Sequence, residues 1–171
     1  APPAPVAPTV IAAAPDGSES SSWYCAGSTG TPGGIAQATI LLTNTTARAE
    51  EGTVTITNDA GATASARVSL PARAETTLTP SGLAHGAWLA AAINVQGGGV
   101  VVTQVVQGPS GWSHSACASA ALRSWYFASG STAAGSAMFI ALFNPTATPA
   151  VIDTTFVTST GPTQPQPYEG I

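Results

Sequence analysis

The chain has 171 residues, enough for one domain or for one full sandwich and part of another, and only 7% of them are charged. An ordinary soluble domain carries roughly 25% charged residues. The net charge is −4, Lys is absent, and Arg48, Arg67, Arg73 and Arg123 are scattered along the chain. Because binding to phosphates or anionic lipids needs clustered cations, this composition argues against a nucleic-acid partner and a polybasic membrane-surface patch.

The first segment, residues 1–21, is rich in Pro, Ala and Ser and has no sustained periodicity. Such a composition predicts an extended spacer that contributes little to a core. Its opening, Ala-Pro-Pro-Ala-Pro-Val-Ala-Pro, is similar to a segment that follows a removed signal or membrane anchor. We therefore expect an extracytoplasmic protein that is anchored through a further N-terminal segment. The apolar runs of this chain itself are too short to span a bilayer.

Strand patterns dominate the following residues, and no stretch has a helical pattern with caps. The expected strands are Ile35–Thr43, Thr53–Asn58, Thr63–Leu70, Ala74–Leu78 at a sheet edge, Trp88–Val95 and Val100–Gln107. The last two are nearly continuous apolar runs, and the Gly-rich link Gln96–Gly99 predicts that they form a hairpin at the centre of the core. Short strands at this spacing indicate an all-β fold, which we expect to be an immunoglobulin-like β-sandwich.

Two cysteines, Cys25 and Cys117, lie beside aromatic residues in this Lys-free, Thr- and Gly-rich chain. An even count in such a chain favours a structural disulfide, with two inert core thiols as the alternative. There is no C-x-x-C motif and no Cys/His cluster, so we expect no metal and no redox catalysis.

An internal repeat with a period of about 100 residues, the usual size of an immunoglobulin-like domain, divides the chain. The first occurrences are Ser22–Ala26, Gly27–Thr29, Ile40–Ala47, Thr55 and Gly61, and the second are Ser124–Ala128, Gly130–Thr132, Ile140–Ala147, Thr155 and Gly161. The repeat predicts a full sandwich over residues 22–123 and a partial second repeat over residues 124–171. A partial repeat cannot bury a core alone, so either the protein continues beyond residue 171 or the second copy packs on the first module. We expect continuation, with residues 124–171 docked on the first repeat and needed for its stability.

The second copy also resembles a known family. The matching segments are Trp125–Ala128, Gly130–Thr132, Ile140–Pro145, Thr154–Phe156 and, ahead of them, Gly111–His114. They are similar to a repeat of actinobacterial extracytoplasmic proteins that also occurs in the DUF5719 family. The resemblance covers about residues 20–171. It implies an envelope protein of high-GC bacteria with tandem β-sandwich repeats and no assigned catalysis.

The sequence gives little support for a set of catalytic residues. His114 lies between Ser113 and Ser115, but neighbouring residues of a strand point to opposite faces, and no G-x-S-x-G motif is present. The acidic pair Glu50-Glu51 is most simply a turn. We therefore expect no enzyme and no cofactor.

Aromatic residues are the stronger functional lead. The residues near the repeat junctions are Trp23, Tyr24, Trp112, Trp125 and Tyr126. Exposed rings of this kind stack on sugars or anchor protein interfaces, whereas buried ones would seal the end of a sandwich. Two hypotheses follow. One is a structural or interaction module with an envelope protein or membrane-protein complex as partner, such as an accessory subunit of envelope-glycan machinery. The other is a module that binds cell-wall glycan.

The motif Asn44-Thr45-Thr46 fits an N-glycosylation sequon, but Asn144 occupies the same repeat position and is followed by Pro145. The comparison favours a turn that ends a strand in both copies.

Overall fold

The computed structural model describes residues 20–31, 33–109, 111–128, 130, 134–135 and 139–165. Most of the expected spacer therefore lies outside the described residues. Strand β1 (Ser20–Ser28) includes the last two residues of that predicted spacer, and Ser20 pairs with Gln96. Ser20 and Ser21, which we expected in the spacer, therefore belong to the first sandwich.

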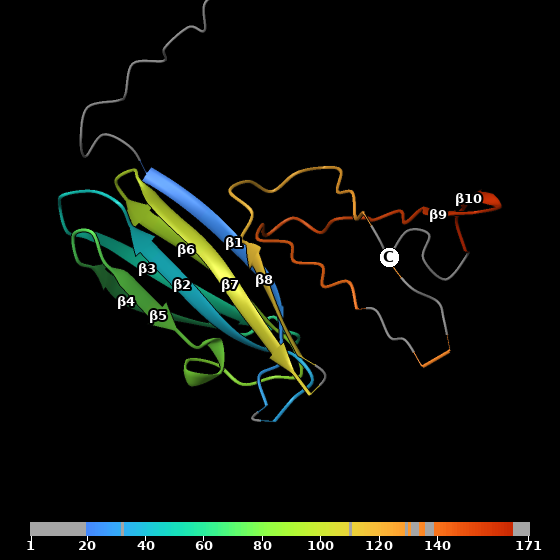
Figure 1. Ribbon diagram of the computed structural model, residues 1–171, viewed down its shortest axis with the longest axis horizontal. Coiled ribbons are helices and arrows are strands. Elements are labelled where there is room, and N and C mark those ends of the chain that lie inside the picture. The colour runs from blue at the N-terminus through green and yellow to red at the C-terminus, as the bar shows by residue number, and fades with distance from the viewer. Residues whose placement is uncertain are drawn as a thin grey trace, which may run out of the picture.

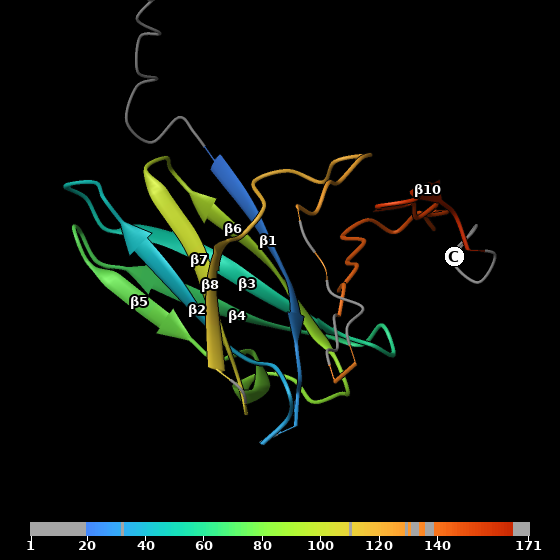
Figure 2. The same ribbon diagram turned by 45° about the vertical axis from the view of Figure 1, so that its right-hand side comes forward.

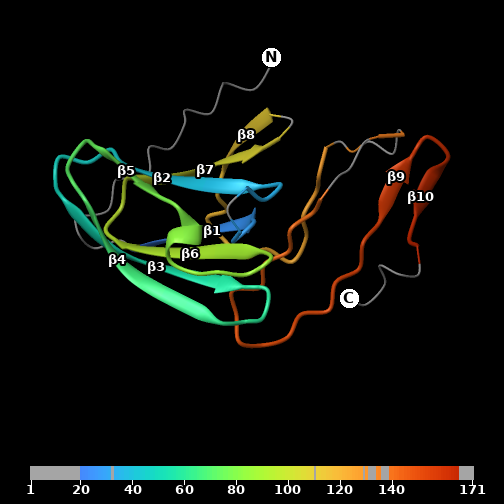
Figure 3. The same ribbon diagram turned by 90° about the horizontal axis from the view of Figure 1, so that it is seen from below.

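Two four-stranded antiparallel sheets pack face to face (Figures 1 and 3). The first has the order β1-β6-β3-β4, and the second has the order β5-β2-β7-β8. Their bounds are β2 Gln37–Asn44, β3 Glu50–Asn58, β4 Thr63–Leu70, β5 Glu75–Leu78, β6 Leu89–Gln96, β7 Val100–Gly108 and β8 Gly111–Ala116. The all-β sandwich is confirmed, as is the place of β5 at a sheet edge. The immunoglobulin-like character stays a prediction.

The core follows from alternation along the strands. Because successive side chains of a strand point to opposite faces, every second residue of β2, β3 and β6 faces the other sheet. The fully buried side chains include Ile40, Leu42, Val54, Ile56, Ile93 and Val102. The Thr residues of β3 alternate with these apolar residues and face outward. The sequence pattern is therefore that of a sheet with one face in the core and one in water.

The predicted hairpin of β6 and β7 is wrong. β6 lies between β1 and β3 in one sheet, whereas β7 lies between β2 and β8 in the other. The link Gly97–Gly99 therefore crosses from one sheet to the other, and the hairpin partner of β7 is β8. Both strands are still central to the core, because each is flanked on both sides within its own sheet.

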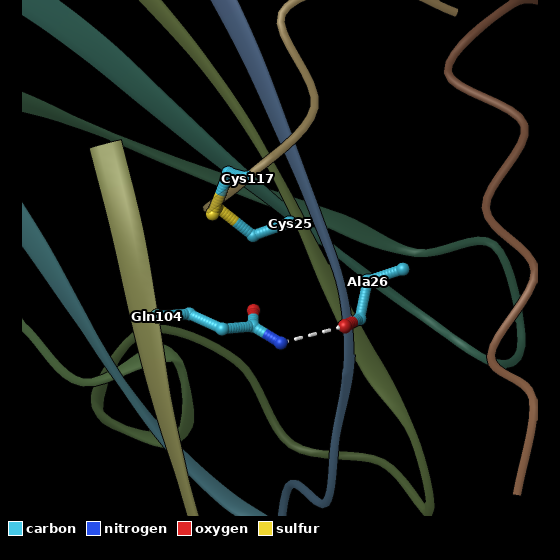
Figure 4. Close-up of a disulfide and its surroundings, with 4 residues drawn as sticks. All are labelled: Cys25, Ala26, Gln104 and Cys117. Carbon is cyan, nitrogen blue, oxygen red and sulfur yellow. Dashed lines mark hydrogen bonds between the residues drawn. A yellow bond between two sulfur atoms is a disulfide. The ribbon is translucent and has the colours of Figure 1, made fainter. Parts of the chain in front are cut away.

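The two sheets are tied together at β1 and β8, where the edge of one sheet meets the edge of the other. Cys25 and Cys117 form the predicted disulfide, with a sequence separation of 92 residues. Beside it, Tyr24 and Ala118 exchange two backbone hydrogen bonds of 2.7 and 2.9 Å. Gln104 of β7 donates from Nε2 to the Ala26 carbonyl at 2.9 Å (Figure 4). This side of the sandwich is therefore closed by covalent and hydrogen bonds.

The described residues after Ala118 lie beside the sandwich, on the side of β1 and β8 (Figures 1 and 2). Among the described residues of 119–155, none lies in a strand. A short hairpin follows, formed by β9 (Phe156–Thr158) and β10 (Gly161–Thr163). Within the described part of the chain, no helix is long and apolar enough to cross a membrane.

Candidate interaction surface

The aromatic residues of β1 belong to the sandwich itself. Trp23 and Cys25 share one face of the strand because they are two residues apart, and Trp23 packs against the buried core. Tyr24 points the other way, and its ring lies 6.5 Å from the ring of Phe143, centroid to centroid. The two members of the Trp23-Tyr24 pair therefore differ in role: Trp23 is a packing residue, and Tyr24 contacts the second copy of the repeat.

The other three predicted residues, Trp112, Trp125 and Tyr126, are exposed. Trp112 is the second residue of β8, five residues before Cys117, which corresponds to about 17 Å along a strand. Trp125 follows β8, and its indole Nε1 donates to the Leu122 carbonyl at 3.2 Å. Tyr126 is 93% exposed. The predicted aromatic set is thus divided between the core, the beginning of β8 and the segment after the disulfide.

Residues 139–143 lie against the first sandwich. The Phe139 ring is 5.9 Å from the ring of Trp88, the residue that precedes β6. A methyl group added at Gly27 would come within 2.8 Å of Ala141 Cβ, so the two backbones approach closely there. A cavity of about 470 Å³ lies between this segment and the ends of β1, β3 and β6. Aromatic rings and backbone groups line it, and Asp59 is the acidic side chain in its lining.

Asp59 fixes the loop that leads into β6. The backbone N–H groups of Ala87 and Trp88 donate to its Oδ1 at 2.8 and 3.3 Å. The hydrogen bond from Trp88, with smaller backbone contributions, holds the pKa of Asp59 below its usual 3.8. This carboxylate positions Trp88 at the cavity wall, so its hydrogen bonds serve the structure of the loop.

The residues considered as catalytic candidates, His114, Glu50 and Glu51, lie on different strands and do not form a site. His114 is exposed on the edge strand β8, between Ser113 and Ser115. Glu50 and Glu51 were expected in a turn, but they are the first two residues of β3 and pair with Leu70 and Ser69 of β4. Among the described residues, no three His, Cys, Asp or Glu side chains gather as metal ligands would.

Most large apolar side chains after residue 118 are exposed. We call six of them the apolar surface: Trp125, Tyr126, Phe127, Phe139, Leu142 and Val157. Sequence reasoning singled out the Trp-Tyr pairs and missed the contact of Phe139 with Trp88. The apolar run that ends at Phe143 was the available signal for that contact. Nothing in the sequence predicted that Gln104, a polar residue in an apolar strand, donates a hydrogen bond to the Ala26 carbonyl.

Comparisons with known proteins leave the family open. No protein-family model matches the chain, and no curated protein matches it. A crystal structure described as Thermotoga maritima 1070 is similar, with a TM-score of 0.47 and 12% sequence identity, over 57% of this chain and 92% of that one. The likeness to the DUF5719 family stays a prediction.

Proposed function

We propose that this chain is a non-catalytic structural and interaction module that works outside the cytoplasm, in the envelope of an actinobacterium. The observation that carries the proposal is the apolar surface defined above. Most of the large apolar side chains in this one segment of the chain are exposed, and exposed apolar side chains that are not scattered singly mark protein interfaces. Aromatic residues such as Trp125 and Tyr126 also dominate the binding energy of protein interfaces.

The compartment is supported by the Cys25–Cys117 disulfide, which is typical of an oxidising environment. The actinobacterial envelope, tandem repeats and a membrane anchor come from the resemblance to the DUF5719 family and from the Pro-rich opening of the chain. An envelope protein or membrane-protein complex, such as the machinery that handles envelope glycans, is the partner that fits this setting.

Glycan binding is the second candidate, and the exposure of Trp112, Trp125 and Tyr126 favours it. Sugar rings stack on exposed indole and phenol faces. Trp23 drops out of this candidate because it packs on the core. Tyr24 drops out as well, because it contacts Phe143.

A binding experiment separates the two. The immobilised chain is exposed to detergent-solubilised envelope proteins of an actinobacterium and, separately, to purified cell-wall glycan. We expect the envelope proteins to bind and Tyr126→Ala to weaken binding about tenfold or more, the range of an interface hot spot. Val101→Ala, an exposed apolar change on β7 outside the apolar surface, is the matched control and should leave binding unchanged.

Two results would contradict the proposal. Binding to glycan alone, weakened by Trp112→Ala or Trp125→Ala, would support the carbohydrate-binding module instead. Binding to envelope proteins that neither Tyr126→Ala nor Trp125→Ala weakens would show that the apolar surface is not the interface.

A further inference from the structure

The cavity between residues 139–143 and the ends of β1, β3 and β6 has the size of a ligand site. Its volume of about 470 Å³ is within the range of about 300–1,000 Å³ that is usual for such sites. The rings of Trp88 and Phe139 lie 5.9 Å apart and are tilted by 42°, and Phe143 adds a third ring to the lining. The strands contribute small residues to it, namely Ala26, Gly27 and Ala90. The lining therefore combines aromatic rings with strand residues that leave room beside them.

Asp59 places one negative charge at this cavity. Its Oδ1 accepts the backbone N–H groups of Ala87 and Trp88 at 2.8 and 3.3 Å, whereas its Oδ2 accepts no hydrogen bond from the described residues. The hydrogen bond from Trp88 holds the pKa of Asp59 below 3.8, so the carboxylate is ionised at neutral pH. Among the described lining residues there is no Arg and no His. The described lining thus offers one carboxylate oxygen and no cation to pair with it.

These groups select among classes of ligand. Asp59 would repel an anion. A sugar needs several polar side chains for its hydroxyl groups, but the Asn58 amide is occupied by its own loop. Asn58 Nδ2 donates to the His85 carbonyl, and its Oδ1 accepts the N–H groups of Ala60 and Ala62. An organic cation fits both parts of the lining, because cations are attracted to the faces of aromatic rings and to carboxylates.

The single open oxygen of Asp59 favours lysine over arginine among cationic side chains. A guanidinium group binds a carboxylate best through two parallel N–H···O bonds, which need both oxygens. Oδ1 of Asp59 is already used by two backbone N–H groups. The ammonium group of lysine is a compact point charge that can pair with one oxygen, and its methylene chain can lie along apolar surface.

We propose that this cavity binds a lysine side chain of a protein partner, with its ammonium group at Asp59 and its methylene chain against Trp88 and Phe139. Phe139 and Leu142 line the cavity and also belong to the apolar surface, so the cavity is continuous with the proposed interface. The inference rests on the proposed function, because that function supplies the partner. It adds one charged anchor to an apolar interface.

The test is a titration of the purified chain with Nα-acetyl-lysine amide, followed through the backbone amide signals of Ala87–Ala90 in ¹H–¹⁵N NMR spectra. Sodium chloride at the same concentration is the reference. Nα-acetyl-norleucine amide is the neutral match, because it has the same carbon chain without the ammonium group. We expect the lysine compound to shift these signals in a saturable manner. The norleucine compound and Nα-acetyl-arginine amide should bind at least about fivefold more weakly.

Two variants remove the two parts of the site. Asp59→Asn removes the charge, keeps an oxygen acceptor for the two N–H groups of the loop, and should weaken binding of the lysine compound about tenfold. Glu75→Gln is its matched control, because Glu75 lies in β5 of the other sheet, outside the cavity lining, and this variant should bind like the natural chain.

Phe139→Leu keeps an apolar side chain, removes one ring, and should weaken binding about threefold. Phe139 is 63% exposed and lies outside the strands. This variant therefore tests the site even if Asp59→Asn disturbs its loop.

Three results would overturn the proposal: no shift at Ala87–Ala90 beyond that of sodium chloride, equal binding of the norleucine compound, or unchanged binding by both Asp59→Asn and Phe139→Leu. Equal or tighter binding of the arginine compound would overturn the choice of lysine. The titration contains no envelope component, so its failure would leave the binding of envelope proteins untouched. A failure of that binding would likewise leave the affinity for the lysine compound unchanged.

Discussion

The turns at Asn44 and Asn144 have the same hydrogen bonds and different surroundings. Asn44 Nδ2 donates to the Arg48 carbonyl at 2.7 Å, and Asn144 Nδ2 donates to the Thr148 carbonyl at 2.7 Å. In both turns, the backbone N–H of the Thr two residues on donates to the Asn Oδ1, at 2.9 and 3.0 Å. Asn44 is buried, whereas Asn144 is exposed.

For the Asn side chain itself, the difference lies in one bond to a distant strand. Asn44 Nδ2 also donates to the carbonyl of Leu70, at the end of β4, at 2.9 Å. It thereby ties β2 of one sheet to β4 of the other, on the side of the sandwich opposite the disulfide. The local turn is encoded by four or five residues, because Asn and Thr side chains bond their own backbone. Its burial is encoded by strands far away in the chain.

The largest effect should come from the disulfide, which the second copy lacks. The double variant Cys25→Ser, Cys117→Ser should lower the free energy of unfolding by about 4–5 kcal/mol, since a loop of this length constrains the unfolded chain by that amount. Urea unfolding followed by Trp fluorescence measures it. A loss below about 1 kcal/mol would show that the hydrogen bonds of Gln104 and Tyr24 suffice to close this side.

The Asn pair should give the next largest effect. Asn44→Ala leaves the Leu70 carbonyl and the Thr46 N–H without their partner, and we expect a loss of about 2–4 kcal/mol, since each unsatisfied buried group costs about 1–3 kcal/mol. Asn144→Ala removes the matching local bonds at an exposed site, where changes cost about 0.5 kcal/mol or less. Chemical denaturation of both variants measures the difference.

Asn44→Asp sharpens this comparison, because it keeps the Oδ1 acceptor and removes the Nδ2 donor. Its loss of stability should exceed that of Asn44→Ala, because the variant places a buried carboxylate against the Leu70 and Arg48 carbonyl oxygens. Equal losses for the Asn44→Ala and Asn144→Ala variants would mean that the tie between β2 and β4 contributes nothing beyond the turn.

Much of the fold could be predicted from local patterns. The alternation of apolar and polar residues predicted a strand over Thr63–Leu70, and β4 has these bounds. The even cysteine count and the composition predicted the disulfide, which is confirmed. The order of strands was not local information. The Gly-rich link after Gln96 looked like a hairpin, but whether β7 returns beside β6 or crosses to the other sheet depends on β2, which is distant in sequence.

The candidate site was less predictable, for a similar reason. A Trp-Tyr pair occurs in both copies, yet Trp23 packs on a core and Trp125 is exposed. The motif sets the identity of the side chains, whereas their exposure depends on what packs against them. The contact between Trp88 and Phe139 joins residues 51 positions apart, and no periodic pattern relates them.

The smallest expected effect concerns Asp59, whose counterpart in the second copy is the uncharged Ser159. Its carboxylate accepts hydrogen bonds from Trp88 and Ala87, and its pKa is held below the usual 3.8. Because the folded pKa is lowered, the stability that this group contributes is fully present above the unfolded value. It is lost as the pH falls below about 3.8 and through the folded pKa.

Asp59→Asn keeps an oxygen acceptor for the two N–H groups and removes the titration. The melting temperature of the natural chain should therefore fall more steeply below pH 3.8 than that of the variant. Every other carboxylate is common to both chains, so the difference between the two curves isolates Asp59. Ser159→Ala is the matched control in the second copy and should follow the natural curve. Parallel curves for Asp59→Asn and the natural chain down to about pH 2, well below the usual carboxyl pKa, would show that the charge of Asp59 does not stabilise the loop before β6.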